Sequence, residues 1–103
     1  MKYSVKLLPI VDYDFTTAKK WYNDQKKGLG EEFKLEVIKE ISYISTSPLH
    51  YQCKYRNLRQ GLVNRFPFSI FYTVEEDKME IIIFGILHNS RDPETVEKRN
   101  KEI

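Results

Sequence analysis

A histidine and an arginine follow the most apolar stretch of this sequence. Residues 81–87 read Ile-Ile-Ile-Phe-Gly-Ile-Leu, and His88 and Arg91 come after them, ahead of Asp92 and Pro93. An unperturbed imidazole titrates at about pH 6.5, so a histidine at a strand end can give or take a proton near neutral pH. The alternative is that His88 is only a half-exposed polar end to a buried strand. The sequence by itself favours this structural interpretation.

Further cations fall on segments that are predicted to be strands, namely Lys54, Arg56, Arg59 and Arg65. Lys54 and Arg56 are two residues apart, so they would share one strand face. Cations gathered on one sheet face would suit an anionic partner. The alternative is that these side chains only solvate an open face and protect the sheet edges. Tyr72 is a further candidate contact residue, although its alternation pattern is more typical of the core.

The composition narrows the classes of function. The chain has 103 residues, of which 41% are hydrophobic, and a net charge of +2. These values are typical of one soluble globular domain over residues 1–103. The charge is too small to indicate nucleic-acid binding by itself. No basic-then-apolar leader opens the chain and no apolar run reaches the length of a membrane span, so we expect a cytoplasmic protein.

Metal and cofactor sites are not indicated. The single cysteine, Cys53, excludes an internal disulfide and a cysteine-rich metal site, and we expect it to be a small buried residue. The sequence has two histidines, no Gly-rich phosphate loop, and no HExxH, CxxC or GxSxG motif. We therefore expect no cofactor and no metal ion.

Hydrophobic periodicity predicts the elements that must position these side chains. In chain order they are a strand at 3–8, helices at 10–27 and 31–44, strands at 54–58, 62–66, 68–74 and 79–87, and a short helix from Pro93. The apolar stripe of the first helix includes Trp21-Tyr22, and that of the second is widened by Ile38. Gln60-Gly61 is predicted to be a turn. The charged residues 94–103 are expected to fray.

The order of these elements predicts an α+β sandwich. Helices joined by Gly28-Leu29-Gly30 must run antiparallel. Consecutive strands with short turns pair antiparallel, which gives a sheet of three or four strands. The strand at 79–87 is apolar at consecutive positions, so it should be central and covered on both faces. The helical hairpin should cover one sheet face and leave the other open and basic.

Three stretches occur in an order that matches a known family. They are Trp21-Tyr22 with residues 28–33 (Gly-Leu-Gly-Glu-Glu-Phe), residues 65–72 (Arg-Phe-Pro-Phe-Ser-Ile-Phe-Tyr), and the apolar strand that ends in His88 and Arg91-Asp92-Pro93. The chain thereby resembles the RelE/ParE superfamily of type II toxin–antitoxin toxins, also described as plasmid-stabilisation proteins, over nearly its whole length. The resemblance implies a small toxin held silent by a cognate antitoxin.

The resemblance also implies candidate site residues. RelE-like members cleave mRNA in the ribosomal A site, without a metal ion, and this implies catalytic roles for His88, Arg65 and Arg91. RNA or partner contacts would then come from Lys54, Arg56, Arg59 and Tyr72. Many RelE-like enzymes carry an arginine on the strand where this chain has Ser69, so the sequence departs from the ribonuclease pattern at that position.

Three functional hypotheses therefore remain open. The first is a ribosome-dependent endoribonuclease acting on mRNA. The second is a non-enzymatic ParE-like inhibitor of DNA gyrase, since ParE-like members share the fold but lack most catalytic groups. The third is a degenerate toxin that retains only antitoxin binding. A homodimer is compatible with each of them.

Overall fold

The computed structural model describes residues 3–101, which form a mixed α+β fold. The elements in chain order are β1 (Ser4–Leu7), α1 (Pro9–Gln25), α2 (Leu29–Thr46), β2 (Cys53–Tyr55), β3 (Leu58–Leu62), β4 (Phe68–Glu75), the 3-10 helix η1 (Glu76–Lys78), β5 (Glu80–His88) and α3 (Pro93–Lys101). The predicted fold class is confirmed. Within the described range, no helix is both long enough and apolar enough to cross a membrane.

The five strands form one sheet in the order β1-β5-β4-β3-β2. The strands β2 to β5 pair antiparallel, as their short connections predict, whereas β1 lies parallel to β5 with Val5 opposite Ile81. This parallel pair requires a long connection, which the helical hairpin and the intervening strands supply. β5 therefore lies inside the sheet. Its residues 81–87 are buried except for the half-buried Ile82, which confirms the predicted central strand.

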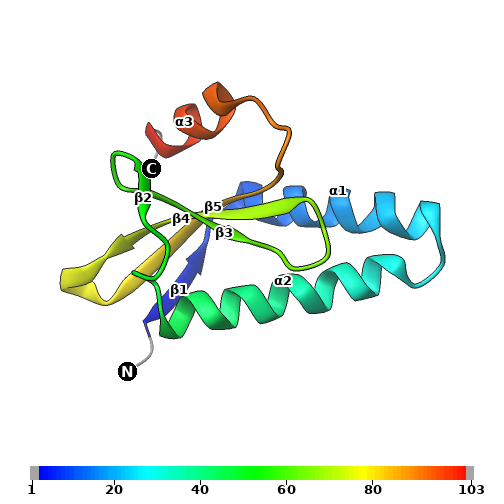
Figure 1. Cartoon of the computed structure of the whole chain (residues 1–103), viewed down its shortest axis with the longest axis horizontal. Helices are drawn as coiled ribbons and strands as arrows, with labels where there is room; N and C mark the ends of the chain where they lie inside the picture. Colours follow the sequence, from blue (N-terminus) through cyan, green and yellow to red (C-terminus); the bar gives the residue numbers. More distant parts are fainter. Residues whose placement is uncertain (1–2, 102–103) are drawn as a thin grey trace.

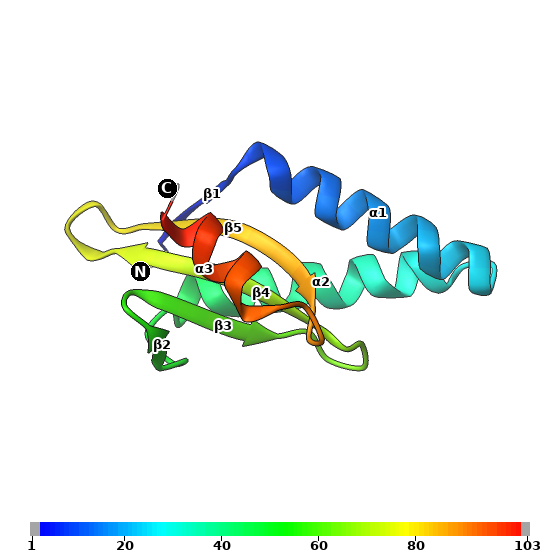
Figure 2. The same cartoon turned by 90° about the horizontal axis from the view of Figure 1, so that it is seen from above.

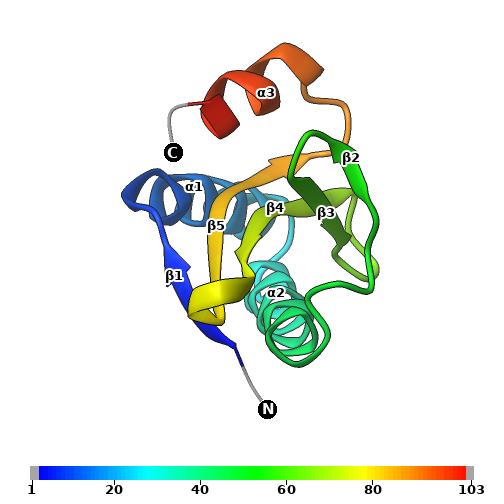
Figure 3. The same cartoon turned by 90° about the vertical axis from the view of Figure 1, so that its left-hand side faces the viewer.

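The helices α1 and α2 form an antiparallel hairpin on one face of the sheet (Figure 3). Gly28 has a left-handed φ of 86° at the corner, which glycine adopts without steric cost. The Gly30 N–H donates a hydrogen bond to Asn23 Oδ1 at 2.7 Å and so ties the start of α2 to the end of α1. Beneath the hairpin, the rings of Tyr22 and Phe66 pack edge to face with centroids 4.9 Å apart. The main core lies here.

The opposite face of the sheet is partly covered by α3 (Figures 1 and 2). Asp92 Oδ1 accepts a hydrogen bond from the Glu94 N–H at 2.9 Å, which is the N-cap expected at a helix start. Val96 is buried and packs with Phe84 in a second apolar cluster. The expected fraying is therefore wrong for residues 94–101, while 102–103 lie outside the described residues. The second face is also less open than predicted.

Two strand boundaries differ from the prediction. The predicted turn at Gln60-Gly61 lies inside β3, and most of the predicted strand at 62–66 is the loop that joins β3 to β4. A Cβ on Gly61 would come within 2.9 Å of Ile44 Cδ1 on α2. This glycine marks a close approach of strand and helix rather than a turn. The turn instead contains Arg56, whose φ is 53°.

Two predictions of apolar packing are also wrong. Cys53 is exposed, not buried, and it lies on β2, an edge strand of the sheet. Ile38 is 50% exposed on α2. The apolar stripe of α2 that meets the sheet is therefore narrower than the periodicity predicts.

Candidate functional site

His88 is the last residue of β5 and its side chain is exposed. Its ring packs edge to face against Phe68, the residue opposite it on β4, with centroids 5.3 Å apart. The Ser90 backbone N–H lies 3.0 Å from His88 Nδ1, and Ser90 Oγ lies 2.7 Å from the same nitrogen. Because a backbone N–H can only donate, Nδ1 is the acceptor and the neutral ring carries its proton on Nε2. His88 therefore presents an Nε2–H donor.

A pocket of about 450 Å³ lies between α1 and the end of β5. Along α1 its lining includes Tyr13, Thr17 and Trp21, which are four residues apart and so share one helix face. The sheet end contributes His88 and Arg91. Tyr13 is 65% exposed and Trp21 is 58% exposed. The pocket thus combines exposed aromatic rings with two groups that can donate hydrogen bonds to an anion.

A buried polar network holds the turn that follows β5. Ser69 on β4 is fully buried, and its hydroxyl donates to Asn89 Oδ1 at 2.5 Å and accepts from Gln60 Nε2 at 2.8 Å. The Asn89 backbone N–H donates to the Pro67 carbonyl at 2.8 Å. The hydroxyl acts as donor and acceptor at once, so the buried polar groups are satisfied. The network fixes the loop between β5 and α3, on which Arg91 lies.

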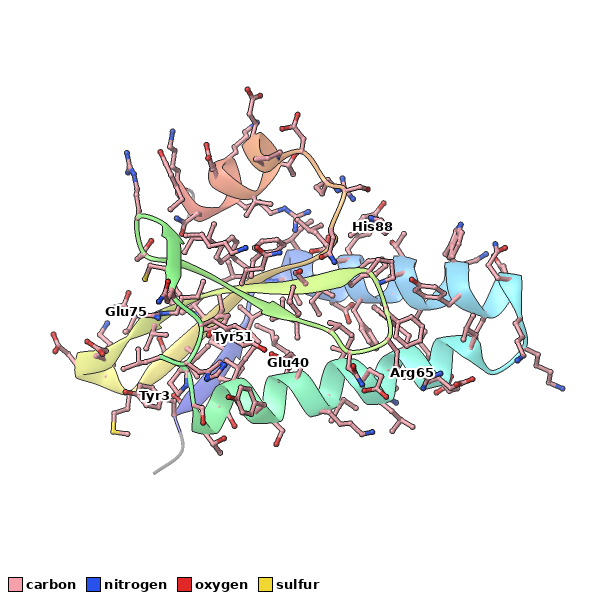
Figure 4. All side chains as sticks on the ribbon, in the orientation of Figure 1. Tyr3, Glu40, Tyr51, Arg65, Glu75 and His88 are labelled. Atoms are coloured by element: carbon pink, nitrogen blue, oxygen red, sulfur yellow. The ribbon has the colours of Figure 1, made fainter. Side chains whose placement is uncertain are left out.

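Arg65 lies on the β3–β4 loop and is paired with α2 (Figure 4). Its Nη2 is 2.8 Å from Glu32 Oε1, and its Nη1 is 3.7 Å from Glu36 Oε2. The hydrogen bond from Arg65 lowers the pKa of Glu32 from its ordinary value. Arg65 does not line the pocket that contains His88 and Arg91. The structure therefore brings His88 and Arg91 together. Arg65, the third predicted catalytic residue, is instead paired with the helical hairpin.

The other candidate contact residues do not share one face. Arg59 donates from Nη1 to the Tyr51 carbonyl and so supports the loop before β2. Tyr72 is fully buried; its hydroxyl donates to the Pro48 carbonyl at 2.8 Å, and burial raises the pKa of the phenol. Arg56 is exposed at the β2–β3 turn. The prediction that Lys54, Arg56, Arg59 and Arg65 share one open basic face is wrong. Arg65 is paired with α2, and Arg59 lies opposite the buried Tyr72 in the β3–β4 pair.

Lys54 lines a second groove, of about 360 Å³, between α3 and strands β2 to β4. Arg91 and Glu97 also line it, above the apolar side chains of Leu58 and Phe71. Arg91 therefore lies between this groove and the pocket that contains His88. Among residues 3–101, no three His, Cys, Asp or Glu side chains lie close enough together to hold a metal ion.

Solved structures with a similar backbone identify the fold. A mutant of the E. coli toxin RelE in the free state matches with a TM-score of 0.73 at 12% identity, covering 100% of this chain and 99% of that chain. The chromosomal ParDE toxin–antitoxin system from P. aeruginosa matches with a TM-score of 0.72 at 15% identity, covering 84% of this chain and 96% of that chain. The chain has the RelE/ParE toxin fold.

A third similar structure is the toxin–antitoxin complex RelBE2 from Mycobacterium tuberculosis, with a TM-score of 0.54 at 12% identity over 88% of this chain and 95% of that chain. No family model matches the chain, and no curated protein sequence matches it. The similarity to the RelE/ParE toxins is therefore one of backbone structure.

The sequence did not predict that Tyr13 and Trp21 line the pocket between α1 and the end of β5, called the α1 pocket below. Trp21 was expected in the apolar stripe of the first helix, but Tyr22 occupies the buried position and Trp21 is exposed. The spacing of Tyr13, Thr17 and Trp21 by four residues was the available signal. It describes a second stripe, distinct from the buried one that includes Ala18.

Proposed function

We propose that this chain is the toxin of a type II toxin–antitoxin system, held silent by a cognate antitoxin. The observation that supports this is the fold, which matches the toxin RelE over 100% of the chain. Two further matches are a ParDE toxin–antitoxin system and a RelBE2 toxin–antitoxin complex. The antitoxin is therefore the partner that the proposal predicts first.

Within that proposal, ribosome-dependent mRNA cleavage is the mode of action that the site supports best. The supporting observation is that His88 and Arg91 line one pocket. RNA cleavage of this type needs a base to remove the 2′-hydroxyl proton, a cation to stabilise the charged phosphorane, and an acid to protonate the leaving 5′-oxygen. Arg91 supplies the cation, and it forms no ion pair with a carboxylate of residues 3–101.

The position of the His88 proton favours a role on the acid side of this reaction. In the neutral ring Nδ1 accepts from Ser90, so the proton is on Nε2. The acid form of the ring also carries a proton on Nδ1. Ser90 Oγ, at 2.7 Å, can accept that proton in a hydrogen bond, and the Ser90 backbone N–H then gives up its contact with Nδ1. Nε2–H then faces the leaving oxygen and transfers its proton as the P–O bond breaks. The 2′-hydroxyl proton is removed by a separate base, because a doubly protonated imidazole has no free lone pair.

A gyrase-type, non-enzymatic toxin is the second candidate, and a specific observation favours it. Arg65 is paired with Glu32 and Glu36 on α2. Ser69 is fully buried, at the position where the resemblance implies an arginine. Of the arginines expected at the site, Arg91 lines the pocket of His88. A toxin without ribonuclease activity would retain fewer catalytic cations than a ribonuclease, as this chain does.

A paired experiment tests both modes of action. The chain is expressed from an inducible promoter, transcripts are mapped by primer extension, and the purified protein is tested for inhibition of gyrase supercoiling. Cleavage of translated transcripts with normal supercoiling supports the ribonuclease. The reverse pattern supports the gyrase inhibitor, and growth without any defect argues against both. Co-expression and pull-down with the adjacent open reading frame tests the antitoxin separately.

A further inference from the structure

We infer that the α1 pocket binds one nucleotide of single-stranded RNA, with the base stacked on Trp21 and the phosphate held by Arg91 and His88. This inference rests on the proposed ribonuclease function and adds a binding subsite to it. The subsite lies on the side of the sheet that carries the helical hairpin, because His88 packs on Phe68 and Phe68 packs on Tyr22 of α1, with centroids 6.0 Å apart.

The aromatic side chains of the pocket supply a stacking surface. Trp21 packs its ring edge to face on Tyr22 at 5.1 Å and 84°, and more than half of Trp21 remains exposed, at 58%. Tyr13 lies two turns earlier on the same helix face and is 65% exposed. At a rise of about 1.5 Å per residue, these two rings are about 12 Å apart along the helix. Exposed tryptophan and tyrosine are the side chains on which unpaired bases stack.

The polar side of the pocket suits a phosphate. Arg91 has no carboxylate partner among residues 3–101, and His88 presents an Nε2–H donor. The carboxylate in the lining belongs to Asp14, and Arg99 neutralises it with a contact of 2.6 Å. The uncompensated charge at this pocket is therefore positive, as an anionic ligand requires.

The size of the pocket separates a nucleotide from a protein partner. Its volume of about 450 Å³ falls in the range of about 300–1,000 Å³ that is typical of small-ligand sites. A nucleotide carries a flat base and an anionic phosphate within one small molecule, which matches a pocket lined by Trp21, His88 and Arg91. The combination of stacking rings and anion donors in one small pocket favours the nucleotide.

The single tryptophan of the chain makes this site directly observable. The probe is a short single-stranded oligoadenylate with 2′-O-methyl riboses, which cannot be cleaved through the 2′-oxygen. We expect it to quench the fluorescence of Trp21 in the purified full chain. Affinity is measured in parallel by anisotropy of the labelled probe at a fixed salt concentration.

Three variants and one control make the test specific. Trp21→Ala should weaken probe binding by about 5- to 150-fold, the effect of losing one stacked base, and Trp21→Phe should recover most of it. Arg91→Ala is the third variant, because it removes the cation that holds the phosphate. Circular dichroism reports whether each variant folds. Leu35→Ala is the matched control, because Leu35 is also 58% exposed but lies on α2 outside the pocket; it should bind like the parent.

The possible outcomes separate this subsite from the proposed function. Unchanged affinity in folded Trp21→Ala or in folded Arg91→Ala overturns the subsite, even if the parent chain still cleaves transcripts. Loss of antitoxin binding with unchanged RNA affinity also overturns it and makes the pocket a protein-docking surface. A chain that inhibits supercoiling and cleaves no transcript overturns the ribonuclease proposal instead, whatever the fluorescence shows.

Discussion

Arg99 on α3 places its guanidinium on the buried carboxylate of Asp14 on α1. Two contacts join them, Nη1 to Oδ2 at 2.6 Å and Nη2 to Oδ1 at 3.1 Å. Asp14 Oδ2 also accepts the backbone N–H of Ile86 at 3.1 Å, and its side chain is only 4% exposed. One ion pair thus connects the last helix, the central strand and the first helix.

Removal of Arg99 should destabilise the protein strongly. In Arg99→Ala the Asp14 carboxylate stays buried without its partner, a change that typically costs about 3–5 kcal/mol of unfolding free energy. Urea denaturation measures it. The control is Lys20→Ala, which breaks the exposed Lys20–Asp24 pair at 3.0 Å and should cost less than about 1 kcal/mol. Equal stability of the two variants would show that α3 is not anchored through this pair.

The two glycines of the helical corner should respond differently to alanine. A Cβ on Gly30 would lie 2.5 Å from the Lys19 carbonyl oxygen and from Asn23 Cγ, so Gly30→Ala must push the helices apart at a cost of about 1–3 kcal/mol. A Cβ on Gly28 would meet nothing within 4 Å, and its φ of 86° alone penalises alanine, by about 1–2 kcal/mol. Urea denaturation measures both variants, and we expect the lower unfolding midpoint for Gly30→Ala. A lower midpoint for Gly28→Ala would contradict this prediction.

The Ser69 hydroxyl should matter for stability although it touches no solvent. Ser69→Ala leaves the Gln60 amide without its buried acceptor, which typically costs about 1–3 kcal/mol. The control is Ser4→Ala, because the Ser4 hydroxyl is exposed and lies 3.4 Å from the Met79 carbonyl. That change should stay within about 0.5 kcal/mol. Thermal or urea unfolding measures the stability of both variants. Equal unfolding free energies would exclude a stabilising role for the network of Ser69.

Glu40 should make the protein less stable as the pH rises. Burial raises the pKa of Glu40 above its ordinary value of 4.5, with the hydrogen bond from Tyr51 and the charge of His50 opposing this. The folded state therefore holds the proton more tightly than the unfolded chain does. Stability is highest below pH 4.5 and falls as the pH rises through the raised pKa. Burial, together with the same hydrogen bond, raises the pKa of Tyr51 to about 12.

Glu40→Gln tests this dependence, because the amide oxygen can still accept the Tyr51 hydroxyl, now 2.8 Å from Glu40 Oε2 (Figure 4). The variant should be more stable than the parent at pH 7 and equal to it at about pH 4, by urea denaturation across the range. Glu75→Gln changes an exposed glutamate and should follow the parent throughout. A parent that is more stable than Glu40→Gln at pH 7 contradicts the predicted sign.

His88→Ala should reduce transcript cleavage by about 10²- to 10⁴-fold, the usual effect of removing a positioned proton-transfer group. The fold should survive, because the side chain is exposed and such changes cost about 0.5 kcal/mol or less. His50→Ala is the matched control, since His50 is also exposed but packs on Tyr43 and Tyr51 away from the pocket. Primer extension after induction measures cleavage. If folded His88→Ala cleaves like His50→Ala, His88 is a structural strand end.

Local pattern determined most of the elements in this chain. The two helices, the glycines at their corner and the Asp92 cap depend on residues a few positions apart, and each lies where the sequence places it. The central position of β5 also follows from sequence, because consecutive apolar residues need cover on both faces. Gly61 is one exception, since its role depends on the distance to α2 and not on its neighbours in sequence.

Only the tertiary structure decided which side chains meet. The sequence supplied His88, Arg65 and Arg91 as three candidates, but the pairing of Arg65 with Glu32 depends on how a loop lies against a helix 33 residues earlier. Asp14 and Arg99 are 85 residues apart, and neither has a local signal for the other. The outward face of Trp21 likewise depends on which of two adjacent aromatic rings packs against Phe66 and Phe68. Periodicity predicts the buried face of a helix to within one residue. Packing decides which of the two adjacent residues is buried, because Tyr22 fills the core while Trp21 stays in solvent.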